Sequence, residues 1–145
     1  MKEKFTGVIT EIEVFYDESN SKYDFIKYDG FRIKTTNGNV EIGIENNVNC
    51  CEYFGTMASN DNFSDFYGAE ILEIKYTREN NKLLETFELK LSEQCIELQD
   101  ILFITLETTK GTLQFAVYNV HNGYYGHDCY VSCDFIKEMN FEEEL

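Results

Sequence analysis

Apolar and polar residues alternate on both sides of a short turn near the start of the chain, and this pattern predicts a β-hairpin. The segment from Phe31 to Thr36 meets the segment from Asn39 to Ile44 across Asn37-Gly38. Asn-Gly between two alternating strands is a strong hairpin signal, because both turn residues must accept positive φ. The sequence therefore predicts a hairpin that turns at Asn37-Gly38.

The position of the turn determines which residues of this hairpin face each other. Pairing across Asn37-Gly38 places Ile33 opposite Ile42 on one face. The other face pairs Lys34 with Glu41, which is a favourable cross-strand charge pair. One face of the hairpin is therefore expected in the core and the other in solvent.

A second hairpin repeats the same pattern later in the chain. The segment from Ile104 to Thr109 turns at Lys110-Gly111 into the segment from Thr112 to Val117. The equivalent pairing places Leu106 opposite Phe115. The two hairpins align along their whole length, including their Thr-Thr and Gly positions, so the chain contains two similar units.

Each hairpin belongs to a longer repeat, over about residues 5–55 and 66–126. The strand before the first hairpin, at Gly7 to Ile12, resembles the one at Gly68 to Ile74, and an aromatic-glycine loop follows each hairpin. The segment from Asp134 to Leu145 fits a short C-terminal helix with Asp134 as its N-cap. We therefore expect a β-dominated α+β fold, in which two strand-plus-hairpin halves pack as one pseudo-two-fold antiparallel-sheet domain over residues 1–145. Chance similarity between β-rich segments is the alternative.

Composition adds a strong and uneven negative charge. The 145 residues carry a net charge of −15, and the only basic residues after Leu91 are Lys110 and Lys137. An excess this large disfavours binding to nucleic acid or to an anionic membrane and favours basic partners. The acidic surface is either a solvated face that keeps the protein soluble or a face that competes for a basic groove on another protein. Its candidate partner-binding residues are Glu93, Glu97, Asp100, Glu138, Glu142, Glu143 and Glu144.

The two loops that follow the hairpins are the candidate ligand site. Their glycines permit a close backbone approach, and their tyrosines could stack on a ring; the alternative is a turn whose aromatic residues plug the junction between the halves. The adjacent Cys50 and Cys51 are either small buried side chains that fill space in the core or a redox or thiolate pair. The candidate ligand-binding residues are Cys50, Cys51, Glu52, Asn122, Gly123, Tyr124, Tyr125, Gly126 and His127.

Metal binding and catalysis find little support in the sequence. His127, Cys129 and Cys133, with His121 nearby, could supply zinc ligands, but no C-x-x-C pair is present. No P-loop, G-x-S-x-G or H-E-x-x-H motif occurs either. We therefore expect no metal, no cofactor and no enzymatic activity. No apolar run is long enough to span a bilayer and the start lacks a signal peptide, so a cytoplasmic protein is expected.

Four segments together resemble a known family: Asn49-Cys50-Cys51-Glu52, Tyr67 to Ile71, Phe103 to Thr109, and His121 to Gly126. Over roughly residues 25 to 132 the chain resembles the DUF7448 family, a domain of unknown function found in bacteria and their phages. The resemblance implies no assigned activity, but it implies a small phage or mobile-element protein, and proteins of that kind often block a host defence system.

Three hypotheses for function follow. The first is a non-enzymatic binding protein that inhibits a host defence protein, for example of the CRISPR type, or a nucleic-acid-handling protein, through its acidic surface. The second is a small-ligand binder that sequesters a signalling nucleotide through the two loops. The third is a structural redox or zinc protein centred on its cysteines.

Overall fold

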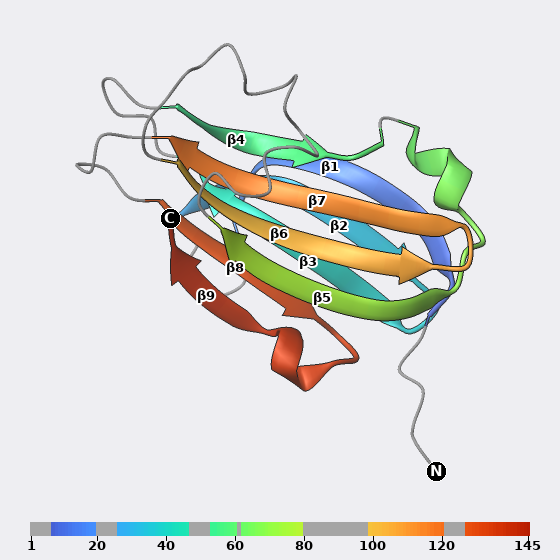
Figure 1. The fold of residues 1–145 in the computed structure, drawn as a ribbon. Helices are drawn as coiled ribbons and strands as arrows, with labels where there is room; N and C mark the ends of the chain where they lie inside the picture. The colour runs from blue at the N-terminus through green and yellow to red at the C-terminus, as the bar shows by residue number, and fades with distance from the viewer. Residues whose placement is uncertain (1–6, 20–25, 47–52, 61, 80–98, 121–126) are drawn as a thin grey trace.

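The computed structural model describes residues 7–19, 26–46, 53–60, 62–79, 99–120 and 127–145. This part of the chain forms two antiparallel sheets that lie face to face as two layers (Figure 1). The five-stranded sheet has the order β1-β2-β3-β8-β9, and the four-stranded sheet has the order β4-β7-β6-β5. The fold is therefore dominated by β-structure, as the alternating sequence predicts.

The strands are 4 to 11 residues long. In the five-stranded sheet they are β1 (Ile9–Ser19), β2 (Lys27–Thr35), β3 (Gly38–Glu45), β8 (Asp128–Cys133) and β9 (Phe141–Glu144). In the four-stranded sheet they are β4 (Tyr53–Ala58), β5 (Ile71–Glu79), β6 (Gln99–Thr108) and β7 (Gly111–Val120). The helical elements of the described residues are two short 3-10 turns, η1 (Phe63–Phe66) and η4 (Lys137–Met139).

The core lies between the two sheets, where every second residue of each strand points inward. Two aromatic rings meet at its centre: those of Phe31 on β2 and Phe115 on β7, whose centroids are 4.8 Å apart. Phe63 of η1 packs edge-on against Phe31, with 6.2 Å between their centroids. Around them lie fully buried aliphatic side chains from both sheets: Ile33, Val40, Ile42, Ile44, Leu102, Ile104, Leu106, Leu113 and Val117.

Strand β6 is buried on both of its faces. Leu102 and Ile104 point into the core between the sheets. Ile101 and Phe103 point the other way, into a second apolar cluster that includes Ala116, and all three are fully buried. This explains why the sequence is continuously apolar from residue 101 to residue 104 rather than alternating.

Both predicted hairpins are present, but their register differs from the prediction. The turns are at residues 36–37 and 109–110, one position earlier than expected, and Ile33 pairs with Val40 rather than with Ile42. The partner of Glu41 is Arg32, so the predicted pair of Lys34 with Glu41 is wrong. In the second hairpin Leu106 likewise pairs with Leu113 and not with Phe115.

The same turn chemistry sets the register in both hairpins. The hydroxyl of Thr35 donates a hydrogen bond to the carbonyl of Gly38 at 2.6 Å, and the hydroxyl of Thr108 donates one to Gly111 at 2.7 Å. Gly38 and Gly111 have φ of 127° and 120°. Each glycine therefore lies at the first position of the returning strand and not inside the turn. Its positive φ lets the backbone turn into that strand.

The start of β1 and the residues before β5 also make matching contacts. Val8 and Glu70 face each other in an antiparallel bridge. The backbone N–H of Thr36 donates to the carbonyl of Val8, and that of Thr109 donates to the carbonyl of Glu70, both at 3.0 Å. The two hairpin turns are therefore tied to the same short bridge between the sheets.

The strand that follows each hairpin along the chain joins the sheet of the other hairpin. β4 follows β3 along the chain but pairs with β7, whereas β8 follows β7 and pairs with β3. Ala58 on β4 lies opposite Phe115, and Val131 on β8 lies opposite Ile42. Each sheet is thus completed by a strand from the other half of the chain.

The predicted C-terminal helix is wrong. After η4 the chain forms β9, which pairs with β8 over four residue pairs, from Val131–Phe141 to Asp128–Glu144. Asp134, the expected N-cap, instead bonds back to the hairpin, and its Oδ2 accepts the N–H of Asn39 at 2.8 Å. No helix in the described ranges has the length and hydrophobicity to cross a membrane.

Candidate functional site

The outer face of the five-stranded sheet carries a cluster of three glutamates around one arginine. The guanidinium of Arg32 donates from Nε to Glu41 at 2.5 Å, from Nη1 to Glu13 at 2.6 Å and from Nη2 to Glu18 at 2.8 Å. It lies 4.8 Å above the ring of Phe15. All three carboxylates are charge-assisted acceptors, so the guanidinium is held in one position.

Strand register explains the first two contacts, and an irregularity in β1 explains the third. Glu13, Arg32 and Glu41 are direct neighbours across β1, β2 and β3, so they share one face of the sheet. The register shifts between Phe15 and Glu18, and Asp17 in this stretch has φ of 58°. This bulge returns Glu18 to the outer face, where it reaches the free end of the guanidinium.

The arginine changes the acid–base properties of its neighbours. Its hydrogen bond lowers the pKa of Glu13 below the ordinary value of 4.5, against the opposing effect of burial. The pKa of Arg32 itself rises because the three carboxylates outweigh its desolvation. Glu13 and Arg32 are therefore both charged at neutral pH.

Tyr130 of β8 extends across the sheet toward this cluster. Its hydroxyl donates to Glu41 at 3.0 Å, and its ring packs edge-on against Tyr28 with 5.0 Å between centroids. It crosses β3 at Gly43, where an added Cβ would lie 2.6 Å from the Tyr130 ring. Burial raises the pKa of Tyr130, so its hydroxyl stays protonated and remains a donor.

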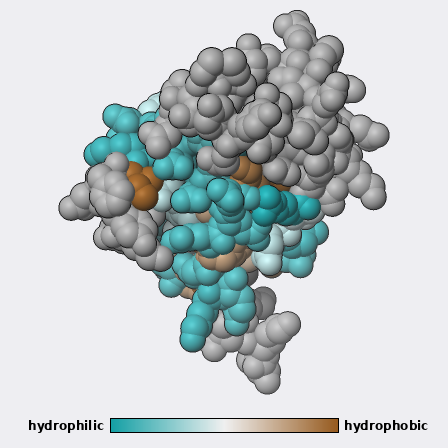
Figure 2. Space-filling view, turned by 90° about the vertical axis from the view of Figure 1, so that its left-hand side faces the viewer, coloured by the Kyte–Doolittle hydropathy of each residue, from teal (hydrophilic) through white to brown (hydrophobic). Residues whose placement is uncertain are grey.

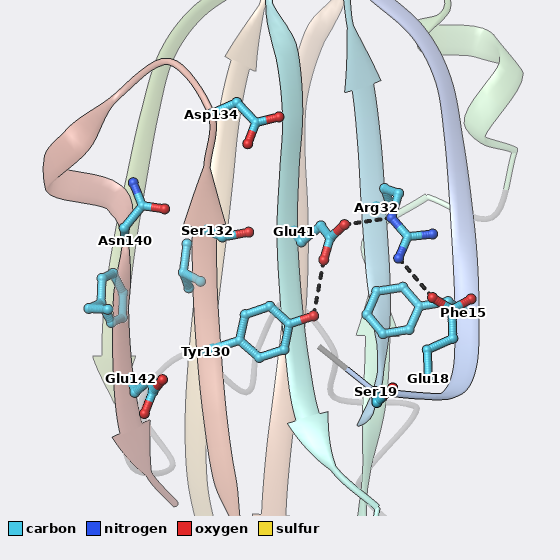
Figure 3. A pocket seen from close by; sticks show the side chains of 12 residues that line it. Phe15, Glu18, Ser19, Arg32, Glu41, Tyr130, Ser132, Asp134, Asn140 and Glu142 are labelled. Atoms are coloured by element: carbon cyan, nitrogen blue, oxygen red, sulfur yellow. Dashed lines mark hydrogen bonds and ion pairs between the residues drawn. The ribbon is translucent and has the colours of Figure 1, made fainter. Parts of the chain in front are cut away.

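A hollow of about 770 Å³ lies on the outer face, and Phe15, Arg32 and Tyr130 are among its lining residues. Figure 3 shows Arg32 and Glu18 toward β1, Tyr130 and Ser132 on β8, and Glu142 toward β9. Four carboxylates line the hollow, from Glu18, Glu41, Asp134 and Glu142, and Arg32 is the one cation among its described lining residues. Aromatic rings with a surplus of carboxylates suit a positively charged group of a ligand or partner.

The acidic residues predicted near the C-terminus occupy different positions. Glu142 and Glu144 are exposed on the outer face of β9, and Glu138 is exposed in η4. Glu143 points to the other side, where Arg78 of β5 donates to it at 2.8 Å. Glu143 therefore stabilises the contact between the edges of the two sheets. Figure 2, which looks onto the end where β9 finishes, shows mainly hydrophilic residues over the described surface.

His127, predicted as a ligand-binding residue, is fully buried and does not line the hollow. Its Nδ1 lies 2.6 Å from the carbonyl oxygen of Glu45. Its backbone exchanges hydrogen bonds of 3.0 and 2.8 Å with Leu145. These contacts fasten the end of the chain to the start of β8.

The two described cysteines, Cys129 and Cys133, are free and buried on the inner face of β8. Burial raises the pKa of Cys129 to about 12 and also raises that of Cys133, so neither is a thiolate at neutral pH. Among the described residues, no group of three or more His, Cys, Asp or Glu side chains could hold a metal ion.

The other predicted site residues lie outside the described part of the chain. For Asp100 the structure gives the backbone position in β6 only. The remaining residues, from the two loops and from the acidic segment before β6, are Cys50, Cys51, Glu52, Asn122, Gly123, Tyr124, Tyr125, Gly126, Glu93 and Glu97.

A family model supports the resemblance read from the sequence. The model of DUF7448, described as a domain of unknown function, matches residues 8–131, which is most of the chain. The chain belongs to the DUF7448 family. The match to this DUF7448 model spans all strands of both sheets except the last residues of β8 and the whole of β9. No curated protein and no solved structure is similar enough to match.

The arginine cluster of this DUF7448 chain is not among the sites predicted from the sequence. Arg32 and Arg78 are its only arginines, and both are ion-paired. A lone arginine on the solvent face of a hairpin, with glutamates on the strands beside it, was the available signal. The incorrect register hid it, because it paired Glu41 with Lys34.

Proposed function

We propose that the chain is a non-enzymatic binding protein whose acidic surface engages a basic surface on a partner protein. The observation that carries the proposal is the composition of the hollow, which is lined by four carboxylates and by one guanidinium that is already ion-paired. The exposed Glu138, Glu142 and Glu144 extend this negative face to the edge of the sheet. Such a face attracts a positively charged partner and speeds association.

We further propose that the partner is a host defence protein, for example of the CRISPR type, or a nucleic-acid-handling protein. Proteins of this kind hold nucleic acid in basic grooves, and an acidic protein surface can compete for such a groove. A phage or mobile-element origin is part of this proposal and rests on the family resemblance, and the net charge of −15 supports the competition. Blocking the groove needs no catalysis, which agrees with the expected absence of enzymatic activity.

The test is retention of host proteins on the immobilised chain, compared between two charge-matched triple variants. The first neutralises the acidic face through Glu138→Gln, Glu142→Gln and Glu144→Gln. The control removes the same charge elsewhere through Asp65→Asn, Glu73→Gln and Glu107→Gln. Glu143 is left intact because it bonds Arg78.

We expect a basic host protein that binds the wild type and the control but not the first variant. Its retention should also fall between about 0.1 and about 1 M salt, where the Debye length shrinks from about 10 to about 3 Å. A partner retained equally by all three proteins, or no partner at any salt concentration, would refute the proposal.

We also infer that the two halves of the chain are copies of one unit related by an approximate two-fold axis. The matching turns at Gly38 and Gly111 and the bridge between Val8 and Glu70 support this. The exchange of β4 and β8 between the sheets supports it too. In this arrangement the acidic hollow lies on the five-stranded sheet, where β9 adds an edge strand that has no counterpart beside β4 in the described part of the chain.

A further inference from the structure

The hollow on the outer face has two halves, and Tyr130 lies between them (Figure 3). The half toward β1 is occupied by the guanidinium of Arg32, between Phe15 and its three glutamates. The half toward β9 is lined by Ser132, Asn140, Phe141 and Glu142. It combines an exposed carboxylate and polar side chains beside the ring of Tyr130, and no lysine or arginine lies among the described residues of its lining.

The occupied half shows how this face holds a guanidinium. Arg32 lies over an aromatic ring, and each of its three guanidinium nitrogens donates a hydrogen bond to a carboxylate, at 2.5 to 2.8 Å. The half toward β9 offers the same two kinds of group, an aromatic ring from Tyr130 and a carboxylate from Glu142. Guanidinium is planar and weakly hydrated, so it stacks on rings and bonds carboxylates better than ammonium does.

We propose that an arginine side chain of the partner protein lies in the β9 half of this hollow, against Tyr130, Ser132 and Glu142. The inference rests on the proposed function, because it names the chemistry by which the partner is recognised on that face. The volume of about 770 Å³ admits an arginine together with the backbone of a short extended segment beside it. Interfaces are enriched in arginine at such partly aromatic positions.

The experiment uses the full chain and two synthetic probes, a hexa-arginine peptide and a hexa-lysine peptide, titrated at low salt and followed by NMR. Two variants add the same positive charge at different places. Ser132→Arg fills the β9 half of the hollow, whereas Thr112→Arg places its charge at an exposed position of β7, on the other sheet. Glu142→Gln is a third variant that removes the carboxylate without adding bulk.

We expect the arginine peptide to shift the resonances of Tyr130, Ser132 and Glu142 and to bind at least tenfold more tightly than the lysine peptide. Ser132→Arg should weaken this binding at least tenfold and Thr112→Arg less than threefold. If Ser132→Arg fails to fold, Glu142→Gln must still weaken the binding of the arginine peptide threefold or more.

Two outcomes overturn the inference, and they separate it from the proposed function. Equal binding of the two peptides, with equal effects of Ser132→Arg and Thr112→Arg, would show general attraction to the acidic surface and no arginine site. This result would leave the proposed function standing. If neither peptide binds at low salt, both the arginine site and the proposed function are refuted, because an acidic face that engages basic partners must attract these probes.

Discussion

Replacing Arg32 by methionine removes the cation of the outer-face cluster but keeps most of its apolar contact with Phe15. The wild-type side chain is 19 % exposed and makes three charge-assisted hydrogen bonds, to Glu13, Glu18 and Glu41. A hydrogen bond to a charged group contributes about 1.5–3 kcal/mol when buried, and partial exposure reduces this toward about 1 kcal/mol. We therefore expect Arg32→Met to lower the free energy of unfolding by about 3 kcal/mol.

The dependence of this loss on pH follows from the pKa of Glu13. Because Arg32 lowers that pKa in the folded state, the stabilising effect is complete above the unfolded value, near 4.5, and is lost as the pH falls through the folded value. In Arg32→Met the three carboxylates repel one another instead. The difference between the two proteins should therefore be largest near pH 7 and shrink below about pH 4.5.

The assay is urea unfolding followed by circular dichroism at several pH values, with Lys34→Met as the control. Lys34 lies two residues further along the same strand, but its Nζ is 3.4 and 3.5 Å from Glu11 and Glu13 and its side chain is 40 % exposed. We expect the control to cost less than about 1 kcal/mol. Equal losses in the two variants, or a difference independent of pH, would refute the view that Arg32 organises this face.

Three further predictions concern individual side chains. Gly38→Ala should destabilise the protein more than Gly111→Ala in thermal unfolding. Both glycines have positive φ, worth about 1–2 kcal/mol of strain for alanine, but only at Gly38 would the new Cβ meet Asp134, at 2.6 Å. Equal losses of stability in the two variants would contradict this. Cys129, with its pKa raised to about 12 by burial, should resist iodoacetamide at pH 8 until the protein unfolds, as peptide mass spectrometry would reveal. Tyr130→Phe should cost about 1 kcal/mol in urea unfolding by removing the bond to Glu41, and an unchanged midpoint would argue against that bond.

The alternating pattern was sufficient to predict the hairpins and their buried faces, but not their register. Moving the turn by one residue shifts each pairing by two positions, so Ile33 stays on the core face whether its partner is Ile42 or Val40. Hydrophobic periodicity cannot separate these alternatives. The hydroxyl of Thr35 and the positive φ of Gly38 decide between them, and both act through the geometry of the turn.

The sequence predicts a C-terminal helix because Asp134 is a suitable N-cap for the segment that follows it. In the structure, long-range pairing decides its conformation: β9 bonds to β8, and the ring of Phe141 lies 4.4 Å from that of Tyr76 on β5. Glu143 gains an ion pair with Arg78 in this extended form. Tertiary contacts thus outweigh the local preference for helix, as is common for short edge strands.

The candidate site depends on which strands become neighbours, and local patterns carry little information on that. The hollow needs β8 beside β3, which brings Tyr130 across Gly43 to Glu41. β8 lies there because it pairs with β3 of the other sheet and not with the hairpin that precedes it along the chain.

The exchange of β4 and β8 also bears on stability. Without β8, the backbone groups of β3 on that side would have no strand partner, and the inward side chains of Ile42 and Ile44 would lose their neighbours Val131 and Cys129. β7 would likewise lose its pairing with β4. Unpaired strand edges beside a buried face are unfavourable and prone to aggregation. The same exchange that builds the acidic hollow therefore makes each sheet depend on the other, so the hollow and the core should be lost together when the protein unfolds.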